Sequence, residues 1–215
     1  MKNLKEHKKM LILTSIVTLL PILIGVFLWD KLPAEIATHF DSNGQPDNWS
    51  SKEFAVFGLP LFLLVIHWIC LICTSSDPKY HRINDKIFTL LVWICPVVSL
   101  FCSILTYGYT LNPNLNINTI GKAFVGIIFI IVGNYLPKCR QNYTVGIKIP
   151  WTLHDEENWN HTHRMAGWLW MLGGLFFIIM SFFDVTNIFI IVGPMLGMTI
   201  IPIIYSYLYY LKHRD

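Results

Sequence analysis

Six long apolar segments run through this chain of 215 residues, and they constrain its fold more than any other feature. A helix that crosses about 30 Å of hydrocarbon needs about 20 mostly apolar residues. Only helices and closed barrels satisfy their backbone hydrogen bonds inside a bilayer. The segments that meet this length are Met10–Trp29, Phe54–Cys73, Ile87–Tyr107, Thr119–Leu136, Met165–Phe183 and Ile188–Leu211. Since 54% of the residues are hydrophobic and 13% are charged, we predict an all-α, polytopic integral membrane protein with six transmembrane helices.

The distribution of Lys and Arg predicts the orientation of these helices. Cytoplasmic segments of membrane proteins carry an excess of both residues. Of the sixteen basic residues, all but Lys31, Lys52 and Lys122 fall in the amino-terminal segment, the second and fourth connections, and the carboxyl tail. We therefore expect both termini to be cytoplasmic and the first connection to lie outside the cell. Topology and lipid contacts account for the net charge of +3, so no nucleic-acid partner is implied.

The first connection, residues 30–53, is acidic. Five acids face two lysines there. Pro33 followed by Glu35 predicts a short helix, because Pro suits the first turn and an acid complements the helix dipole. Ser42–Pro46 predicts a turn, and Trp49 is expected at the headgroup boundary. A basic peptide is attracted by such a face, and the candidate contact residues are Glu35, His39, Asp41, Asp47 and Trp49.

The fourth connection, residues 133–164, is far longer than the roughly 2–8 residues that usually join two helices. Alternating apolar residues in Asn142–Ile149 predict a short strand or hairpin that Pro150 ends. Thr152 is then expected to be the N-cap of a helix that begins at Leu153 and continues into the fifth span. Four-residue spacing places Trp159, His163 and Gly167 on one face of that helix.

Several polar residues of this inner loop are candidates for function: Asn134, Lys138, Asn142, Trp151, Thr152, Trp159, His163 and Arg164. One interpretation gathers them around a cytoplasmic polar cavity, and the other places Asn134 and Lys138 at a helix end among the headgroups. Arg164 either snorkels to the membrane surface or anchors the loop by pairing with Asp155 or Glu157, or by gripping a phosphate.

We predict neither a metal nor a cofactor in this loop. The histidines at 154, 161 and 163 stand among acids, but none are four residues apart, the helical spacing that brings two imidazoles together. No nucleophile–base pair or glycine-rich phosphate loop is evident, so we predict that the chain is not an enzyme. His67, deep in the second span, is predicted to be a hydrogen-bonded structural residue.

Two groups of residues resemble known membrane modules. The first connection is similar to a small membrane module of unknown function that often precedes an SdpI-type region. Its matching positions are Leu32, Pro33, His39, Phe40, Gly44, Asp47, Trp49 and Lys52. The inner loop resembles the signature of the SdpI immunity family. Its matching positions are Gly133, Asn134, Leu136, Pro137, Lys138, Asn142, Gly146, Ile147, Pro150, Trp151, Thr152, Leu153, Trp159, Thr162, His163 and Arg164. Lys148 and Ile149 stand where the family pattern often has Arg and Thr.

The resemblance covers nearly the whole chain and implies two parts, an amino-terminal membrane module at 1–75 and an SdpI-type membrane region at 76–215. It implies a multi-pass protein of the bacterial plasma membrane that protects its producer against a secreted, sporulation-delaying-type peptide toxin. The expected partners are the toxin at the outer face, a cytosolic regulatory protein at the inner loop, and membrane lipids. The alternative is a membrane enzyme, or a protein that binds a lipid or small ligand, with its site in loop 133–164.

Overall fold

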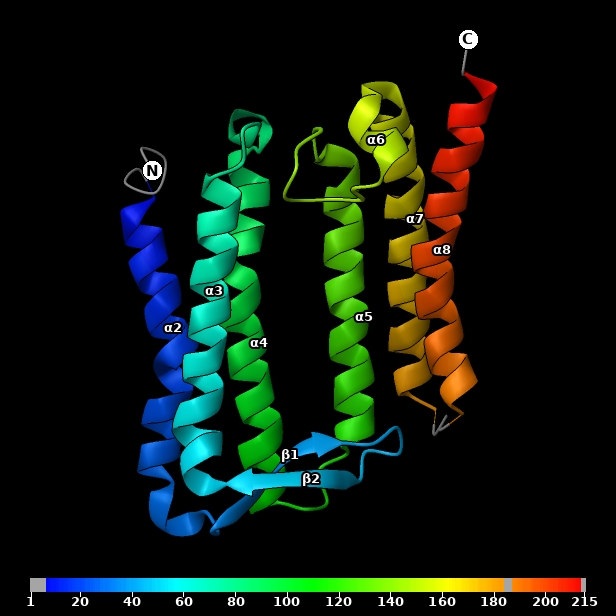
Figure 1. Ribbon diagram of the computed structural model, residues 1–215. Helices are drawn as coiled ribbons and strands as arrows, with labels where there is room; N and C mark the ends of the chain where they lie inside the picture. The colour runs from blue at the N-terminus through cyan, green and yellow to red at the C-terminus, as the bar shows by residue number, and fades with distance from the viewer. Residues whose placement is uncertain (1–6, 184–186, 214–215) are drawn as a thin grey trace. The chain divides into compact units, whose positions relative to one another are not determined.

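The computed structural model describes residues 7–183 and 187–213, and six helices in these ranges are long and apolar enough to cross a membrane (Figure 1). Each overlaps one predicted segment, so the prediction of a six-span helical membrane protein is confirmed. The spans are α2 (Lys8–Phe27), a π-helical turn (Phe54–Gly58) continued by α3 (Leu59–Ser75), α4 (Asp85–Leu111), α5 (Ile117–Tyr135) continued by a 3₁₀ turn (Leu136–Lys138), α7 (Glu156–Ser181) and α8 (Ile188–Lys212).

The chain forms two compact units. The first comprises Met1–Ser76 and Phe88–Ile117, and the second comprises Asp77–Ile87 and Asn118–Asp215. The first unit contains α2, α3, most of α4 and a two-stranded sheet, whereas the second contains α5, α7, α8 and the inner loop with its short helix α6 (Pro150–His154).

Buried polar side chains join the three helices of the first unit. The hydroxyl of Thr14 on α2 lies 3.2 Å from Nε2 of His67 on α3. The hydroxyl of Ser99 on α4 donates to the carbonyl of Thr18 on α2 at 2.8 Å. Interhelical hydrogen bonds of this kind hold membrane helices together where the hydrophobic effect contributes little. His67 is 1% exposed, and its prediction as a hydrogen-bonded structural histidine is confirmed.

The first connection folds into a β-hairpin rather than the short helix that we predicted at Pro33 and Glu35. Strand β1 (Glu35–Phe40) pairs antiparallel with β2 (Pro46–Ser51) at the end of this unit away from the start of α2 (Figure 1). The helix prediction was wrong because Pro33 lies just outside β1 and starts no helix. Ile36, Thr38 and Phe40 alternate along β1, and β-branched and aromatic residues at alternate positions are typical of strands.

The hairpin is anchored to the helices by an apolar cluster. Ile36, which is 1% exposed, packs with residues that precede the hairpin, follow it, and lie on α4. The other members of this cluster are Leu32, Ala55, Val56 and Tyr107. The predicted turn is confirmed: the N–H of Asp41 donates to the carbonyl of Gln45 at 2.8 Å, and Gly44 adopts a φ of 76°.

In the second unit, glycines bring α5 and α7 into backbone contact. A Cβ added to Gly126 or Gly133 of α5 would lie 2.6 or 2.8 Å from the carbonyl oxygen of Gly174 or Gly167 on α7. Helices that approach so closely are typical of membrane proteins, where small residues allow backbone packing. On the other side of α7, the buried amide of Asn158 donates to the carbonyl of Ser206 on α8 at 3.0 Å and accepts from its hydroxyl at 2.7 Å.

The inner loop departs from the sequence prediction in three ways. Residues 142–149 form no strand, because side chains rather than a partner strand bind their backbone groups. Thr152 is not the N-cap of α6; Ile149 occupies that position, and Thr152 accepts the Ile149 N–H at 3.1 Å. The helix also does not run unbroken from Leu153. It breaks at Asp155, whose carboxylate caps α7 by accepting the N–H of Glu157 at 2.8 Å.

Candidate functional site

The hairpin forms one wall of a small pocket. Glu35 and Ala37 are two residues apart on β1 and therefore project to the same face, and Trp49 is the cross-strand partner of Ala37. This face meets the last turns of α4 and the segment after it around a cavity of about 170 Å³. Its lining residues are Pro33, Glu35, Ala37, Trp49, Tyr109, Thr110 and Pro113. Glu35 is exposed, Trp49 is 51% exposed, and Ala37 is buried at 4%.

The other acids predicted on this loop have different surroundings. Asp47 forms an exposed hydrogen bond with Nδ1 of His39 across the hairpin. Asp41 accepts the backbone N–H groups of Gln45 and Asn43, each at 2.8 Å. These bonds, that of Gln45 first, lower the pKa of Asp41, so its carboxylate stabilises the turn in the charged form. Of the five predicted contact residues, the pocket brings together only Glu35 and Trp49.

Lys52, which directly follows β2, binds the segment that precedes the hairpin. The ammonium of Lys52 donates to the backbone carbonyls of Trp29 at 3.2 Å and Leu32 at 3.1 Å, and it lies 4.6 Å from the centre of the Trp29 ring. Its charge therefore stabilises the entry to the hairpin. The exposed acids of the first connection, Asp30, Glu35, Asp47 and Glu53, give its surface a negative potential.

Within the inner loop, Asn142 binds the backbone on both sides of its own position. Its carbonyl oxygen accepts the N–H groups of Thr144 at 2.9 Å and Val145 at 2.6 Å. Its amide nitrogen donates to the carbonyls of Arg140 at 2.8 Å and Val145 at 3.0 Å. The side chain is completely buried, so Asn142 fixes the loop conformation and offers no surface to a ligand.

Asp77, in the connection between α3 and α4, also binds the inner loop next to Asn142. One carboxylate oxygen accepts the N–H of Tyr143 at 2.8 Å and the hydroxyl of Thr144 at 2.6 Å, and the other accepts the N–H of Lys79 at 2.7 Å. Burial acts to raise the pKa of Asp77, but the bonds from Thr144 and the backbone outweigh burial and lower it. Asp77 is therefore a charged clamp on the loop.

His163 and Trp159 close the loop onto α7. Nε2 of His163 accepts the N–H of Ile147 at 2.9 Å, so this nitrogen carries no proton, and Nδ1 donates to the Trp159 carbonyl at 2.8 Å. The two rings stack at 4.0 Å, and the Trp159 indole donates to the Cys139 carbonyl at 2.7 Å. Gly146, at a φ of 115°, passes directly over both rings; a Cβ there would collide with Nε2 of His163.

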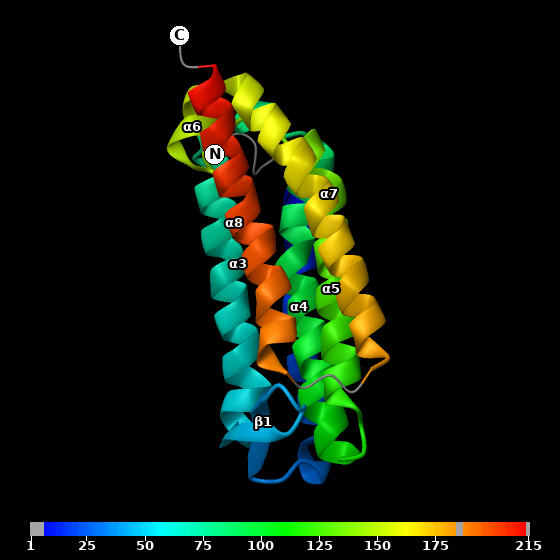
Figure 2. The same cartoon turned by 90° about the vertical axis from the view of Figure 1, so that its right-hand side faces the viewer.

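Thr152 and Gln141 secure the α6 turn. The Thr152 hydroxyl donates to the Ile147 carbonyl at 2.7 Å. Gln141 donates to the carbonyls of Thr152 at 2.9 Å and Leu153 at 3.0 Å, and accepts from the ammonium of Lys79 at 2.6 Å. Figure 2 shows α6 beside the carboxyl end of α8, where Trp151 packs against the Tyr207 ring at 4.9 Å.

The predicted inner-loop residues do not converge on one cavity. Asn142, Thr152, Trp159 and His163 belong to the buried network described above, and Trp151 packs on α8. Asn134 and Lys138 are exposed and bond to each other at 3.2 Å, as their four-residue spacing suggested. Arg164 is exposed, and within the described residues it pairs with neither predicted acid.

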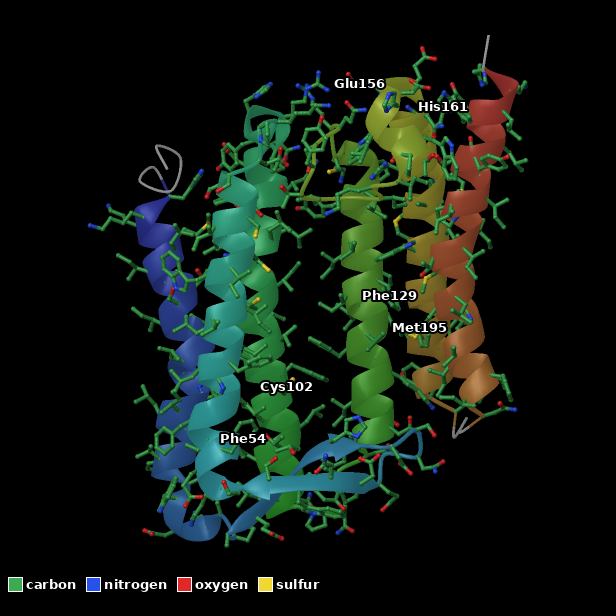
Figure 3. All side chains as sticks on the ribbon, in the orientation of Figure 1. Phe54, Cys102, Phe129, Glu156, His161 and Met195 are labelled. Carbon is green, nitrogen blue, oxygen red and sulfur yellow. The ribbon has the colours of Figure 1, made fainter. Side chains whose placement is uncertain are left out.

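The anchoring ion pair of this loop joins different residues. Arg82 binds Glu156 at 3.0 Å; Figure 3 shows Glu156 and His161 on the end of α7 nearest α6. His161 stacks on Tyr209 at 4.9 Å, whereas His163 is buried against the backbone, so these histidines do not share a ligand. Within residues 7–183 and 187–213, no three His, Cys, Asp or Glu side chains are arranged to hold a metal ion.

Sequence reasoning missed residues that contribute as much as those it selected. Asp77 binds a residue 66 positions away, and nothing in its local pattern signals that contact. Tyr109, in the last turn of α4 and two residues beyond the predicted apolar segment, likewise gave no sign that it lines the hairpin pocket. Gly146 did carry a signal, because a glycine that interrupts an apolar alternation often marks a position that needs positive φ.

Comparison with known proteins finds a sequence match for the inner loop and another for the hairpin. Residues 138–206 match the sequence profile of the SdpI/YfhL protein family, and residues 16–64 match a profile described as a domain of unknown function, DUF1648. The chain is therefore similar to the SdpI/YfhL family in its carboxyl-terminal part. It is 28% identical over 206 residues to the protein named "Immunity protein SdpI" of Bacillus subtilis (strain 168), an alignment that covers 94% of this chain and 96% of that protein. No solved structure shows significant similarity to this chain.

The SdpI/YfhL match contains α6, α7 and most of α8, and the DUF1648 match contains the hairpin. With its six spans and this similarity, the chain is a multi-pass protein of the bacterial plasma membrane.

Proposed function

We propose that this chain is an immunity protein that protects the bacterium producing it against a secreted antimicrobial peptide. The similarity to Immunity protein SdpI along 94% of the chain carries this proposal. Because the alignment spans all six helices and both polar connections, the two proteins share an architecture rather than a single motif.

The hairpin is the surface that we assign to the peptide. The positive-inside rule predicts that the hairpin lies outside the cell, where a secreted peptide arrives. Its exposed acids favour association with a basic peptide, and such steering weakens as salt screens the charges. Burial of the apolar side of the peptide against the protein would then compete with its insertion into lipid.

We propose a structural role for the buried part of the inner loop and a cytosolic regulatory partner for its exposed part. Arg140 and Tyr143 are exposed there, and arginine and aromatic side chains are enriched at protein interfaces. Photocrosslinking from position 143 in living cells tests this assignment, and recovery of lipid alone would refute it.

The enzyme or lipid-site alternative receives less support from the geometry. It requires Asn134, Asn142, Trp151, His163 and Arg164 to face a common space. In the described structure, Asn142 and His163 are saturated with backbone hydrogen bonds. Asn134 bonds to Lys138, Trp151 packs against Tyr207, and Arg164 is exposed. A lipid that co-purifies stoichiometrically with the protein and is lost in Arg164→Ala would reverse this preference.

The deciding experiment expresses the chain in a toxin-sensitive bacterium that lacks its own immunity protein. Survival and membrane potential are measured under purified sporulation-delaying-type peptide, with membrane abundance checked for each variant. We expect wild-type chain and Arg164→Ala to preserve both readouts. We expect a variant in which the five acids of the first connection are converted to Asn or Gln to protect less, with a difference that shrinks at high salt. No protection by well-expressed wild type would refute the proposed immunity.

A further inference from the structure

The hairpin pocket has the dimensions of one side chain. Sites that enclose drug-sized ligands usually measure about 300–1,000 Å³, whereas this cavity measures about 170 Å³. Ala37 is the one buried residue of its lining, and a larger side chain there would occupy part of the space. A whole peptide cannot enter such a space, but the end of one side chain can.

The chemistry of the lining selects a cation. The rings of Trp49 and Tyr109 contribute aromatic surface, and the faces of such rings attract cations, with Trp the strongest. Glu35 contributes a carboxylate that, within the described residues, has neither a hydrogen bond nor an ion pair. A neutral polar group would gain less from this lining, and an acidic group would be repelled by Glu35.

The hairpin does not fill the pocket with its own lysine. Lys52 is bound to the carbonyls of Trp29 and Leu32. Lys52 does not line the cavity. The carboxylate and the aromatic surface are therefore available to a cation from another molecule.

We propose that this pocket binds the guanidinium or ammonium group of one basic side chain of the antimicrobial peptide. The inference rests on the proposed immunity function and on the outward orientation of the hairpin. The general negative potential of the hairpin attracts the peptide, whereas Glu35, Trp49 and Tyr109 recognise one basic residue of the peptide. Protection then depends on the position of a charge and not only on the number of charges.

The first test compares two substitutions that remove the same charge from exposed acids of one loop. Glu35→Gln changes the pocket, and Glu53→Gln does not, because Glu53 lies outside the lining. We expect Glu35→Gln to lower the toxin concentration that cells survive by about tenfold, as expected from losing one charge-assisted contact with a cation. Glu53→Gln should remain within about twofold of wild type. Ala37→Leu, which fills the cavity and keeps every charge, should behave like Glu35→Gln at equal membrane abundance.

The outcomes separate the two proposals. If wild type protects but Glu35→Gln and Glu53→Gln protect equally well, the pocket assignment is wrong and the immunity function stands. If wild type does not protect, the immunity function fails, and the assignment of a toxin side chain fails with it.

The second test observes the pocket directly and does not depend on cell survival. The chain has five alanines, so ¹³C-methyl labelling of alanine in the full-length protein in nanodiscs gives a simple NMR spectrum. Titration with N-acetyl-arginine amide should shift the Ala37 methyl signal saturably. The neutral analogue N-acetyl-citrulline amide should not, and Glu35→Gln should abolish the shift. Equal shifts with both amides, or none at Ala37, would overturn the proposal.

A lipid headgroup is the competing source of an organic cation at this surface. Nanodiscs of phosphatidylglycerol alone are therefore compared with nanodiscs that contain phosphatidylethanolamine. We expect the peptide-free Ala37 signal to be the same in both. A shift caused by phosphatidylethanolamine, together with loss of arginine amide binding, would assign the pocket to a lipid and refute the peptide assignment.

Discussion

Replacing Asp77 by Asn tests whether one carboxylate holds the inner loop closed. Asp77 accepts three hydrogen bonds of 2.6–2.8 Å, from the N–H of Lys79, the N–H of Tyr143 and the hydroxyl of Thr144. Asn has one acceptor oxygen and one NH₂ group, so in either orientation at least one donor loses its acceptor. A hydrogen bond to a charged group contributes about 1.5–3 kcal/mol. We expect the free energy of opening the loop to fall by about this amount.

Cys139 reports the opening. Its side chain is 5% exposed, and burial raises the pKa of the thiol to about 11, so the closed loop resists alkylation. The assay uses protein in which the other four cysteines are replaced by Ala, namely Cys70, Cys73, Cys95 and Cys102. When reclosing is faster than labelling, the maleimide reaction rate follows the open population. A loss of about 1.5–3 kcal/mol then gives roughly ten- to hundredfold faster labelling, since each 1.4 kcal/mol is tenfold.

The matched control is Asp85→Asn, which removes the same charge from an exposed acid in the first turn of α4. We expect it to change the labelling rate by no more than about twofold, as is usual for surface substitutions worth less than about 0.5 kcal/mol. Labelling of denatured protein gives the rate for the fully open thiol. If Asp77→Asn labels no faster than Asp85→Asn and both remain far below that limit, Asp77 does not close the loop and the reasoning is refuted.

Three further predictions concern backbone geometry and pH. Gly146→Ala forces an L side chain into a φ of 115° and against Nε2 of His163. It should cost at least about 1–3 kcal/mol of stability, measured as a lower unfolding temperature in detergent, and an unchanged temperature would contradict the geometry. The pKa of Asp77 is lowered in the folded protein. Its stabilisation of the loop should therefore be fully present above about pH 5 and be lost as the pH falls through the folded pKa, below about 3.9. Hydrogen exchange of the amides that Asp77 binds, corrected for pH, measures this, and a loss of protection above pH 5 would contradict the direction of the pKa shift. Gly133→Val should separate α5 from α7 and destabilise the protein by about 1–3 kcal/mol, whereas Gly121→Val, where a Cβ meets nothing within 4 Å, should leave the unfolding temperature unchanged.

The membrane architecture was predictable from sequence because a bilayer imposes length and polarity on each span independently of its neighbours. Met10–Trp29 identifies α2 without any knowledge of α3 or α4, and the same holds for the other five segments. The positions of Trp159 and His163 on one helical face were predictable for a similar reason, since four-residue spacing is a local property of a helix.

The connections were harder to predict because distant residues determine their backbone. In isolation, the alternation in residues 142–149 suits a strand, and a strand needs a partner for its N–H and C=O groups. Here Asp77 and His163 take those groups instead, from 66 and 16 residues away. The helix predicted at Pro33 was wrong for the opposite reason. The alternation of β1 is a local pattern that the sequence shows, but Pro33, which also suits the start of a helix, lies just outside β1.

The inner loop and the hairpin differ in whether their polar groups are available to bind another molecule. Polar groups of the inner loop stabilise its fold, whereas those of the hairpin can take part in recognition. Within the described residues, no buried side-chain N or O atom lacks a hydrogen-bond partner; the buried groups of the inner loop, Asn142 among them, are satisfied by other parts of the second unit. Glu35, in contrast, lines a pocket with Trp49 and Tyr109, and its carboxylate has no such partner in the part of the chain that the structure describes. Substitutions at Asn142 should therefore reduce protection only by reducing the amount of folded protein, because removing a buried hydrogen-bonding group costs about 1–3 kcal/mol for each partner left unsatisfied.

This difference can be measured by plotting cell survival under toxin against the amount of folded protein in the membrane. Wild type expressed at graded levels defines the reference curve. Asn142→Ala should fall on that curve, because the molecules that fold retain an intact hairpin. Glu35→Gln should fall below it, because each folded molecule binds the peptide less well. If Asn142→Ala falls below the curve and Glu35→Gln falls on it, recognition belongs to the inner loop, and the assignment of the hairpin to the peptide is wrong.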